Sequence, residues 1–461
     1  MSPLKSAWEL ASERVIASRY RVEREDQPLD FVVIPEFSDR EDRVVESNES
    51  HLITDPDKER EKKVSNIKIQ DPQSIVVSDK IMEVIWQGQF FDYGGFARMN
   101  RTMAFGLSNR NVKVKVEMDT FLTHVNKATQ EQLNNMTRYE VSKTAPKVYG
   151  VTVPMRVSYP GRKILYTMIE SSECVHPDYA GKLSMVDEVW VASKYGRDIM
   201  EKSNIKMPVY VMPLGVDINR YKPNCGKMDF GSTRKFVFLS VFRWSYRKGF
   251  DVLLKAFMEE FSGEEDVSLL MVSRAVECPE ENSIAKIAED FASVRSFIKK
   301  SDDELPHVAL YTKPIHEKDM PKVYGSSDAF VLISRGEGFC LPMVEAASCG
   351  LPVIASNVTA QRDFLKEDNS YLVEPEGYVE AKLNSNTAQM AKLCRFYEGQ
   401  RFPDFGRRAI EQTREHMRYV YENYQSAKTK AEKLRNLVVN NYTWDMAIDR
   451  VYNRLKEIYN D

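Results

Sequence analysis

The sequence lacks several features that would assign it to a familiar class at once. No run of about 18 apolar residues is present, so no segment is predicted to span a membrane. The 6 cysteines are dispersed without a CxxC pair, as expected of reduced thiols and not of a disulfide framework or zinc site. With 65 Lys+Arg against 68 Asp+Glu, the chain has no basic surplus for nucleic acid. Because the N-terminus is too charged for a secretory signal, we expect a cytoplasmic protein.

Common catalytic signatures are also missing. No GxGxxG follows a predicted strand, and GxxxxGK[ST], HExxH and GxSxG do not occur. The 6 histidines do not cluster at metal-ligand spacing. Dinucleotide oxidoreductases, P-loop NTPases, zincins and ordinary α/β-hydrolases are therefore excluded.

The 461 residues exceed one ordinary core and indicate two or three domains. Residues 1–80 form a charged extension, with a possible helix over 4–24 and a short strand at Phe31–Ile34. Alternating charges without an apolar period are typical of a solvated or mobile segment, and an element that docks a partner is the alternative.

From residue 81 onward, short apolar runs alternate with helical stretches. Near-continuous apolar strands are typical of parallel sheets with both faces covered. The pattern predicts an α/β fold of two facing, doubly wound, Rossmann-like domains with a cleft between them, at 81–215 and 216–443. The predicted strands are Met82–Trp86, Val112–Val116, Ile164–Ile169, Val189–Val191, Val209–Met212, Phe236–Phe242, Val267–Val272, His307–Tyr311, Ala329–Ile333, Pro352–Ala355 and Tyr371–Val373.

The boundary is expected within Pro213–Lys235, which is rich in Gly, Pro, Asn and Lys. Near the C-terminus, Glu411–Leu437 is predicted to be one long charged helix. The apolar stripe of Met446–Tyr459 predicts a further helix, over about 444–459, that packs back on the first domain.

Ligands of open parallel sheets bind beyond the carboxyl ends of the strands. After the strand Phe236–Phe242 come Arg243 and Lys248, directly before a predicted helix. Arginine can grip two phosphate oxygens, lysine adds a point charge and a helix N-terminus favours an anion. Taken alone, a solvated basic turn accounts for this pattern better than a pyrophosphate site does.

A second candidate loop follows Ala329–Ile333 and reads SRGEGFCLPMVEAASCG. Gly336 and Gly338 permit close approach to the backbone, while Pro342 and Gly350 suit the start and end of a helix. Glu337 and Glu345, with seven residues between them, could each bind a vicinal pair of hydroxyls on a ribose or sugar. Two exposed glutamates on a helix would be the chance alternative.

At these residues the sequence resembles the retaining, nucleotide-sugar-dependent glycosyltransferases of family 4, the group 1 transferases with the GT-B architecture. GEGFCLPMVEAASCGLPVIAS is similar to their E-x7-E signature. VFRWSYRKGFDVLLKAF, VYVMPLGVDINRYKP and MVDEVWVASKYGRDIMEKSNI resemble three further segments of the family, in the family's order.

The resemblance implies roles for particular residues. Arg243 and Lys248 would hold the donor diphosphate, Glu345 the ribose hydroxyls and Glu337 the transferred sugar. The backbone at Gly338, Phe339, Cys340 and Leu341 would approach the phosphate and sugar, and Tyr311–Ile315, with Thr312, would border the base. Gly94 and Gly95 correspond to the family's glycine loop beside the diphosphate and acceptor.

The resemblance also implies a mechanism. The leaving diphosphate would be stabilised by fixed cations and amide dipoles, and its own oxygen would act as base while the acceptor attacks on the same face. No DxD motif occurs where a metal would be needed, so metal independence is expected, with no cofactor beyond the nucleotide sugar. Glu170 stands where many relatives have His; it could orient a sugar hydroxyl or assist proton transfer, or be a structural loop carboxylate.

The acceptor would be a hydroxyl of a saccharide, lipid-linked saccharide or protein. A GT-B synthase or phosphorylase acting on a small sugar, and a catalytically idle GT-B binding module, are the alternatives. Basic residues could favour an anionic acceptor or peripheral contact with a membrane, although a solvated rim is the simpler reading: Lys143, Lys147, Arg156, Arg162 and Lys163. The nucleotide, the sugar and the oligomeric state stay open.

Overall fold

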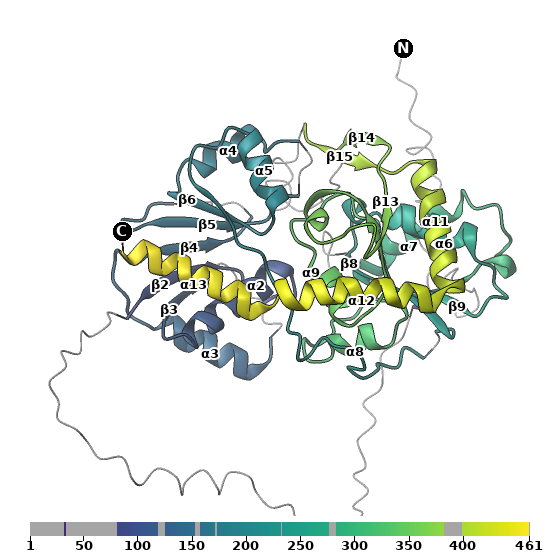
Figure 1. Cartoon of the computed structure of the whole chain (residues 1–461), viewed down its shortest axis with the longest axis horizontal. Helices are drawn as coiled ribbons and strands as arrows, with labels where there is room; N and C mark the ends of the chain where they lie inside the picture. Colours follow the sequence, from purple (N-terminus) through teal and green to yellow (C-terminus); the bar gives the residue numbers. More distant parts are fainter. Residues whose placement is uncertain are drawn as a thin grey trace, which may run out of the picture. The chain divides into compact units, whose positions relative to one another are not determined.

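The computed structural model describes residues 32–33, 81–118, 125–152, 157–170, 173–231, 233–275, 283–381 and 399–460. Apart from Val32–Val33, the charged extension over 1–80 and its predicted helix lie outside these residues, as does Arg156. Both large sheets of the described chain belong to one compact unit. We call the parts built on them the first and second domains (Figure 1).

The first domain is built on a six-stranded, wholly parallel sheet with the strand order β3-β2-β4-β5-β6-β7. The strands are β2 (Glu83–Gly88), β3 (Lys113–Met118), β4 (Lys147–Gly150), β5 (Lys163–Thr167), β6 (Glu188–Val191) and β7 (Val209–Val211). Its helices are α2 (Gly95–Ser108), α3 (Lys127–Thr137), α4 (Pro177–Leu183) and α5 (Lys194–Lys202). The sequence pattern missed β4, because only Val148 and Tyr149 in it are apolar.

The second domain is built on a seven-stranded parallel sheet with the order β1-β10-β9-β8-β11-β12-β13. The strands are β1 (Val32–Val33), β8 (Phe236–Arg243), β9 (Val267–Arg274), β10 (His307–Tyr311), β11 (Ala329–Leu332), β12 (Val353–Ser356) and β13 (Tyr371–Val373). Strand β1 pairs with β10, so part of the predicted Phe31–Ile34 strand extends this sheet. An antiparallel pair, β14 (Gly377–Glu380) and β15 (Arg401–Asp404), lies apart from it.

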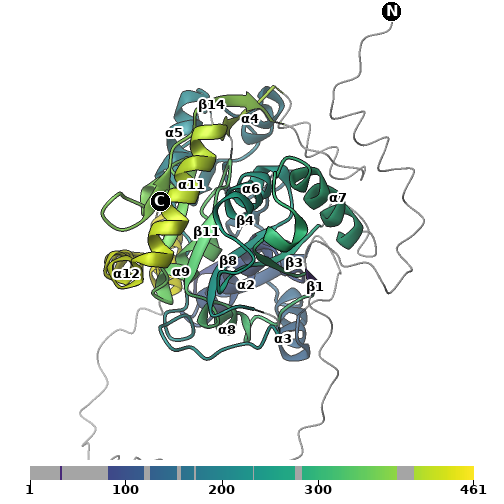
Figure 2. The ribbon, with the colours of Figure 1, turned by 90° about the vertical axis from the view of Figure 1, so that its right-hand side faces the viewer.

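Helices cover both faces of the second sheet, which explains its nearly continuous apolar strands. Figure 2 shows α6 (Phe250–Glu260) and α7 (Ser283–Arg295) on one side, with α9 (Leu341–Ser348) and α12 (Tyr424–Asn441) on the other. Helix α8 (Met320–Gly325) packs against α9. The prediction of two Rossmann-like α/β domains is confirmed.

The predicted single helix over Glu411–Leu437 is wrong. The segment forms two helices, α11 (Arg407–Glu422) and α12, which meet at a sharp angle in Figure 1. Asn423 between them has φ −117° and ψ 44°, outside the helical region. Charge patterning does not reveal such a break, because charged residues continue on both sides of Asn423 and neither Gly nor Pro lies between Arg407 and Asn441.

The last helix, α13 (Trp444–Asn460), packs on α2 of the first domain. Glu188, which is 0% exposed, anchors this helix. The Glu188 carboxylate accepts hydrogen bonds from Arg454 Nη2 (2.7 Å), Arg162 Nη2 (3.0 Å) and Trp190 Nε1 (2.8 Å). Two guanidinium groups and an indole N–H thus satisfy one buried carboxylate.

The chain returns to the first domain beside the segment by which it left. Val216 N–H donates to Tyr442 O (2.9 Å) and Trp444 N–H donates to Val216 O (3.3 Å). A Cβ added at Gly215 would lie 2.2 Å from the carbonyl carbon of Thr443, so glycine is required there. The two crossing segments therefore touch through their backbones.

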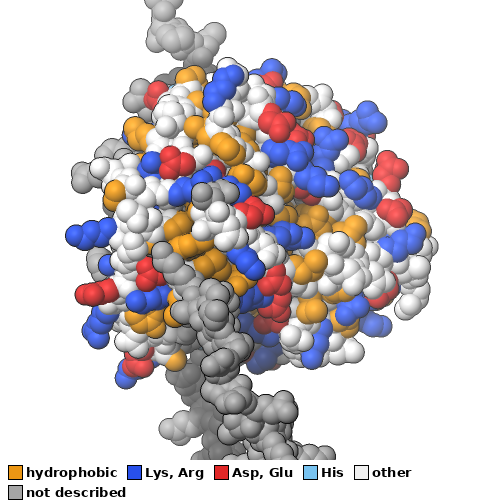
Figure 3. Space-filling view, turned by 60° about the vertical axis from the view of Figure 1, so that its left-hand side comes forward, with side chains coloured by type: hydrophobic (Ala, Val, Ile, Leu, Met, Phe, Trp, Pro, Cys, Tyr) orange, Lys and Arg blue, Asp and Glu red, His pale blue; other side chains and the backbone are white. Residues whose placement is uncertain are grey.

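The described surface carries both signs of charge. Figure 3 shows Lys and Arg interspersed with Asp and Glu over one face, in keeping with a formal net charge of −3. No helix among the residues with assigned positions is long and apolar enough to cross a membrane.

The Glu188 cluster generates a stability prediction. Replacing Arg454 with Met should lower the free energy of unfolding by about 2 kcal/mol, because the buried Glu188 loses two charge-assisted hydrogen bonds while Arg162 remains. Urea denaturation measures the change, and Lys456→Met, at an exposed position of the same helix, is the matched control. Equal stability of the two variants would contradict the anchoring role.

Candidate active site

The candidate site lies at the strand order reversals of both sheets. In the second sheet, β8 lies between β9 and β11, and in the first sheet β2 lies between β3 and β4. The loops after β8 and β11 carry Arg243–Gly249 and Ser334–Cys340, and the loop after β2 carries Asp92–Gly95. Such switch points are where doubly wound sheets leave room for ligands.

Two helix N-termini, one from each domain, lie close together. Helix α2 begins at Gly95 and α9 at Leu341, and a Cβ added at Gly95 would lie 3.9 Å from Leu341 Cδ1. Neither helix has a side-chain cap hydrogen bond, although the N–H of Gly94 donates to Asp92 Oδ1 and the N–H of Met343 donates to Cys340 O (3.1 Å). Both helix dipoles therefore favour negative charge at the same place.

Arginine side chains add positive charge there. A Cβ added at Gly94 would lie 3.1 Å from Arg243 Nη2, so Arg243 reaches from β8 to the start of α2. Arg243 is exposed, and among the described residues its guanidinium has no side-chain hydrogen bond or salt bridge, although the carboxylate of Asp92 lies close enough to interact with it electrostatically. Arg274 is its register partner at the end of β9. The predicted phosphate-binding Arg243 is thus available to an anion.

Lys248 is brought to the same loops but is paired. Its Nζ lies 2.5 Å from Glu337 Oε1, and the two side chains are only 13% and 4% exposed. Burial alone would raise the pKa of Glu337, but Lys248 and Arg247 outweigh it and hold that pKa below its ordinary value. Glu337 is therefore an anion at neutral pH.

A glycine and an arginine hold this basic loop in place. Gly249 has φ +68°, and a Cβ there would lie 1.8 Å from Ile333 O, so only glycine fits. Arg335, 1% exposed, pairs with both carboxylate oxygens of Asp251 (2.8 Å each) and donates to Tyr246 O (2.8 Å). These contacts join the loop after β11 to the loop after β8.

The loop after β11 also touches the first domain. A Cβ at Gly336 would lie 2.5 Å from Glu170 O, and one at Gly338 would lie 2.6 Å from Met168 Cβ. The sequence predicts that these glycines permit close approach of a ligand, and in the structure both also lie against the loop that follows β5. Glu170 is placed at the site, where its carboxylate forms an ion pair with Arg247 (3.1 Å between Oε1 and Nη1).

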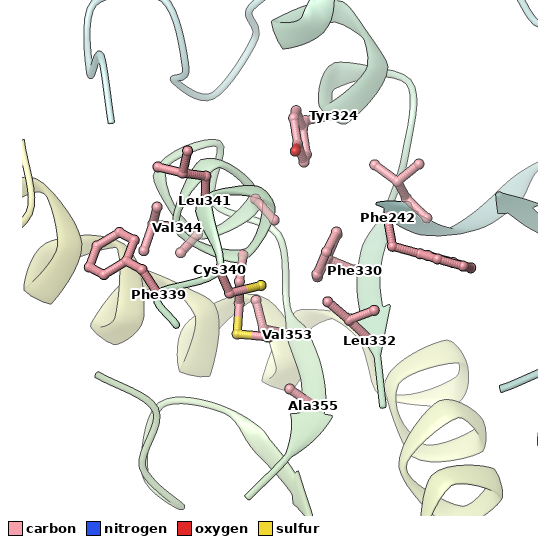
Figure 4. Close-up of a cluster of buried hydrophobic side chains, with 14 of the residues drawn as sticks. Phe242, Tyr324, Phe330, Leu332, Phe339, Cys340, Leu341, Val344, Val353 and Ala355 are labelled. Atoms are coloured by element: carbon pink, nitrogen blue, oxygen red, sulfur yellow. The ribbon is translucent and has the colours of Figure 1, made fainter. Parts of the chain in front are cut away.

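The backbone turns sharply at the start of α9. Cys340 has φ +73°, the left-handed region that non-glycine residues avoid. The side chains of Phe339, Cys340 and Leu341 are buried in the core under α9 (Figure 4). Phe339 packs 6.0 Å from the ring of Phe364. Core packing thus holds a strained turn at the start of α9.

Glu345 lies in α9 and is 2% exposed. It accepts hydrogen bonds from Tyr324 Oη (2.6 Å) and from Arg98 Nη1 of α2, which crosses from the first domain. Burial raises the pKa of Glu345, although Arg98 and Tyr324 oppose that shift. Arg98 also contacts Glu317 (3.6 Å) and Tyr221 Oη (3.3 Å).

The predicted site residues thus do not all lie close together. Arg243, Lys248, Glu337, Glu345, Gly94 and Gly95 converge, with Glu170 beside them. Thr312 directly follows β10 at the same sheet edge but is separated from β8 by β9. The sequence reasoning missed Arg98, Arg247, Arg335 and Tyr324. Arg247 and Arg335 lay within the quoted motifs, whereas nothing local marks Arg98 or Tyr324.

Comparisons with known proteins agree with this architecture. Residues 233–384, about a third of the chain, match the family model described as "Glycosyl transferases group 1". A structure of Anabaena HepE with UDP and glucose superposes with a TM-score of 0.55 at 13% identity, covering 82% of this chain and 100% of that one. The fold is therefore GT-B.

The curated relatives match over shorter stretches. An O-antigen chain mannosyltransferase B of Escherichia coli is 46% identical over 50 residues, 11% of this chain and 13% of the relative. A GDP-mannose-dependent alpha-mannosyltransferase of Mycobacterium tuberculosis is 31% identical over 102 residues, 22% of this chain and 26% of the relative. The chain thus matches only about a quarter or less of these relatives' lengths.

The buried Lys248–Glu337 pair gives a prediction. Lys248→Met should cost about 3 kcal/mol of unfolding free energy at pH 7, because it leaves the buried Glu337 charged without its ion-pair partner. Adding Glu337→Gln should recover most of this loss, since the amide carries no charge. Urea denaturation of the single and double variants measures both.

The same pair has a defined pH dependence. Because the pKa of Glu337 is lowered by folding, its stabilisation is present above its unfolded value of 4.5 and is lost as pH falls below it. Without Lys248, burial should raise the pKa of Glu337, so the stability difference between wild type and Lys248→Met should shrink as the pH falls from neutrality and go on shrinking below about pH 4.5, until Glu337 is protonated in wild type as well. A constant difference would contradict the assignment.

Proposed function

We propose that this protein is a retaining, metal-independent glycosyltransferase of group 1 that moves a hexosyl group from a nucleoside diphosphate sugar to a hydroxyl of a saccharide or glycoconjugate. The observation that carries the proposal is the meeting of two uncapped helix N-termini with the exposed Arg243. This is an arrangement suited to a diphosphate. The group 1 match over residues 233–384 supports it.

The mechanism follows from where charge develops. Breaking the bond between sugar and diphosphate places negative charge on the leaving group and positive charge on the anomeric carbon. Arg243, Lys248 and the amides of Cys340 and Leu341 would stabilise the leaving diphosphate without reorganising. Its oxygen would then take the proton of the acceptor hydroxyl, on the face from which it departs.

The carboxylates would position the donor. Glu345 would accept hydrogen bonds from the ribose hydroxyls and Glu337 from the transferred sugar. Because Glu345 is paired with Arg98, ribose binding would replace this cross-domain contact. Glu170, held by Arg247, would face the sugar from the first domain as an orienting group.

Fixed protein cations support metal independence. Arg243, Arg247, Lys248 and Arg274 gather at the carboxyl ends of β8 and β9. They can supply the charge that a divalent cation provides to a diphosphate elsewhere. The mannosyltransferases among the relatives, one named for GDP-mannose, make GDP-mannose the first donor to test.

The function is tested by titrating UDP-, GDP-, ADP- and dTDP-sugars in the presence of EDTA, using calorimetry. We expect one nucleotide to bind selectively and Arg243→Gln to weaken it by about tenfold to a hundredfold, the loss of a charge-assisted contact. Lys322→Gln, an exposed cation of the same domain, should bind as wild type does. The anomeric configuration of the product, read by NMR, tests retention.

Other outcomes would select another function. Sugar release that requires orthophosphate would indicate a phosphorylase. Absence of binding to every donor would indicate an idle GT-B module. Transfer that EDTA abolishes would overturn metal independence alone.

The Arg98 contact predicts a pH dependence. In Arg98→Met the cation that opposes burial is gone, so the pKa of Glu345 should rise further. Donor binding by this variant should strengthen as pH rises from about 6 to 9, because only the ionised carboxylate accepts two ribose hydrogen bonds. Calorimetry at several pH values measures the slope. A pH dependence identical to that of wild type would contradict the role of Arg98.

A further inference from the structure

Two cysteines that sequence spacing does not connect lie side by side. Cys225 belongs to the segment that joins β7 to β8, and Cys349 ends helix α9. Their Sγ atoms are 3.9 Å apart, and both are free thiols. A disulfide has an S–S distance of about 2.05 Å, so a bond needs an approach of about 2 Å.

The two thiols have unequal surroundings. Cys225 is partly exposed and its thiol donates to Pro321 O at 3.0 Å, whereas Cys349 is buried. The hydrogen bond from Cys349 lowers the pKa of Cys225 to about 6, while the pKa of Cys349 is raised. Cys225 therefore has the exposure and ionisation of an attacking thiol, and Cys349 those of a protected resolving thiol.

The pair is connected to the carboxylate of the candidate site. Cys349 N–H donates to the main-chain oxygen of Glu345 at 3.0 Å, so it closes the helical turn that carries that residue. On the other segment, Tyr221, four residues before Cys225, contacts Arg98 through its hydroxyl at 3.3 Å. A movement of either sulfur atom is therefore expected to shift groups that surround Glu345.

We propose that Cys225 and Cys349 form a reversible disulfide that fixes the interdomain segment to α9 and weakens donor binding at Glu345. With hydrogen peroxide as oxidant, the Cys225 thiol loses its proton, its thiolate breaks the O–O bond and becomes a sulfenic acid, and the released hydroxide takes up that proton to give the first water. The Cys349 sulfur then forms the S–S bond and expels the hydroxyl, which leaves as water with the Cys349 proton. Two thiols and one peroxide give one disulfide and two waters.

The experiment treats the full chain with stoichiometric hydrogen peroxide and maps its peptides without reduction. We expect a cross-linked peptide pair containing Cys225 and Cys349, loss of two titratable thiols per chain, and full reversal by dithiothreitol. Cys225→Ser should abolish the cross-link, while Cys174→Ser, at an exposed cysteine, should leave it unchanged. The peptide map of the wild-type chain is the decisive measurement, so the test does not depend on whether the variants are stable.

Other results would overturn the site. Accumulation of Cys225 sulfinic acid without a cross-link would show that Cys349 does not resolve it. A bridge between other cysteines would show that a different pair reacts.

The effect on donor binding rests on the proposed function and is measured separately. The oxidised chain should bind the preferred nucleotide several-fold more weakly than the reduced chain, with no such change in Cys225→Ser. Equal affinities would overturn the coupling to Glu345. If the disulfide forms but the reduced chain binds no nucleotide, the proposed function fails and the thiol site stands.

Discussion

The whole site depends on the close approach of the two domains around a buried carboxylate. Glu345 is buried and charged groups lose their hydration on burial, so it needs partners. One partner, Tyr324, comes from its own domain, and the other, Arg98, comes from the opposite one. Satisfying this carboxylate therefore brings α2 against α9 and sets the two helix N-termini beside each other.

Much of the fold could be predicted because both sheets are buried on both faces. In β8 and β11, apolar residues follow one another without alternation, and the segment boundaries were right to within one or two residues. Strand β4 was not predicted because its ends are Lys147 and Gly150. The break at Asn423 was not predicted because it depends on the angle between two helices, which no local sequence pattern indicates.

The positions of Arg243, Lys248 and Glu337 could be predicted because these residues closely follow strand ends in the chain, and that of Glu345 because it shares a motif with Glu337. The site was not predictable where a partner comes from far along the sequence. Arg98 and Glu345 are 247 residues apart, and Cys225 and Cys349 are 124 apart. A single sequence records which residues are present but not which distant pairs meet, and the role of Gly336 and Gly338 as contacts between domains shows the same gap.

The paired backbones of Val216 and Tyr442–Trp444 limit how the domains can move. A single connecting chain would let one domain rotate freely relative to the other, because each of its backbone torsion angles can change independently. Two chains hydrogen-bonded side by side behave as a ribbon, which flexes across its thin direction far more easily than it twists. Opening to admit a ligand would then follow one bending axis, so that α2 and α9 return to the same alignment on every closure.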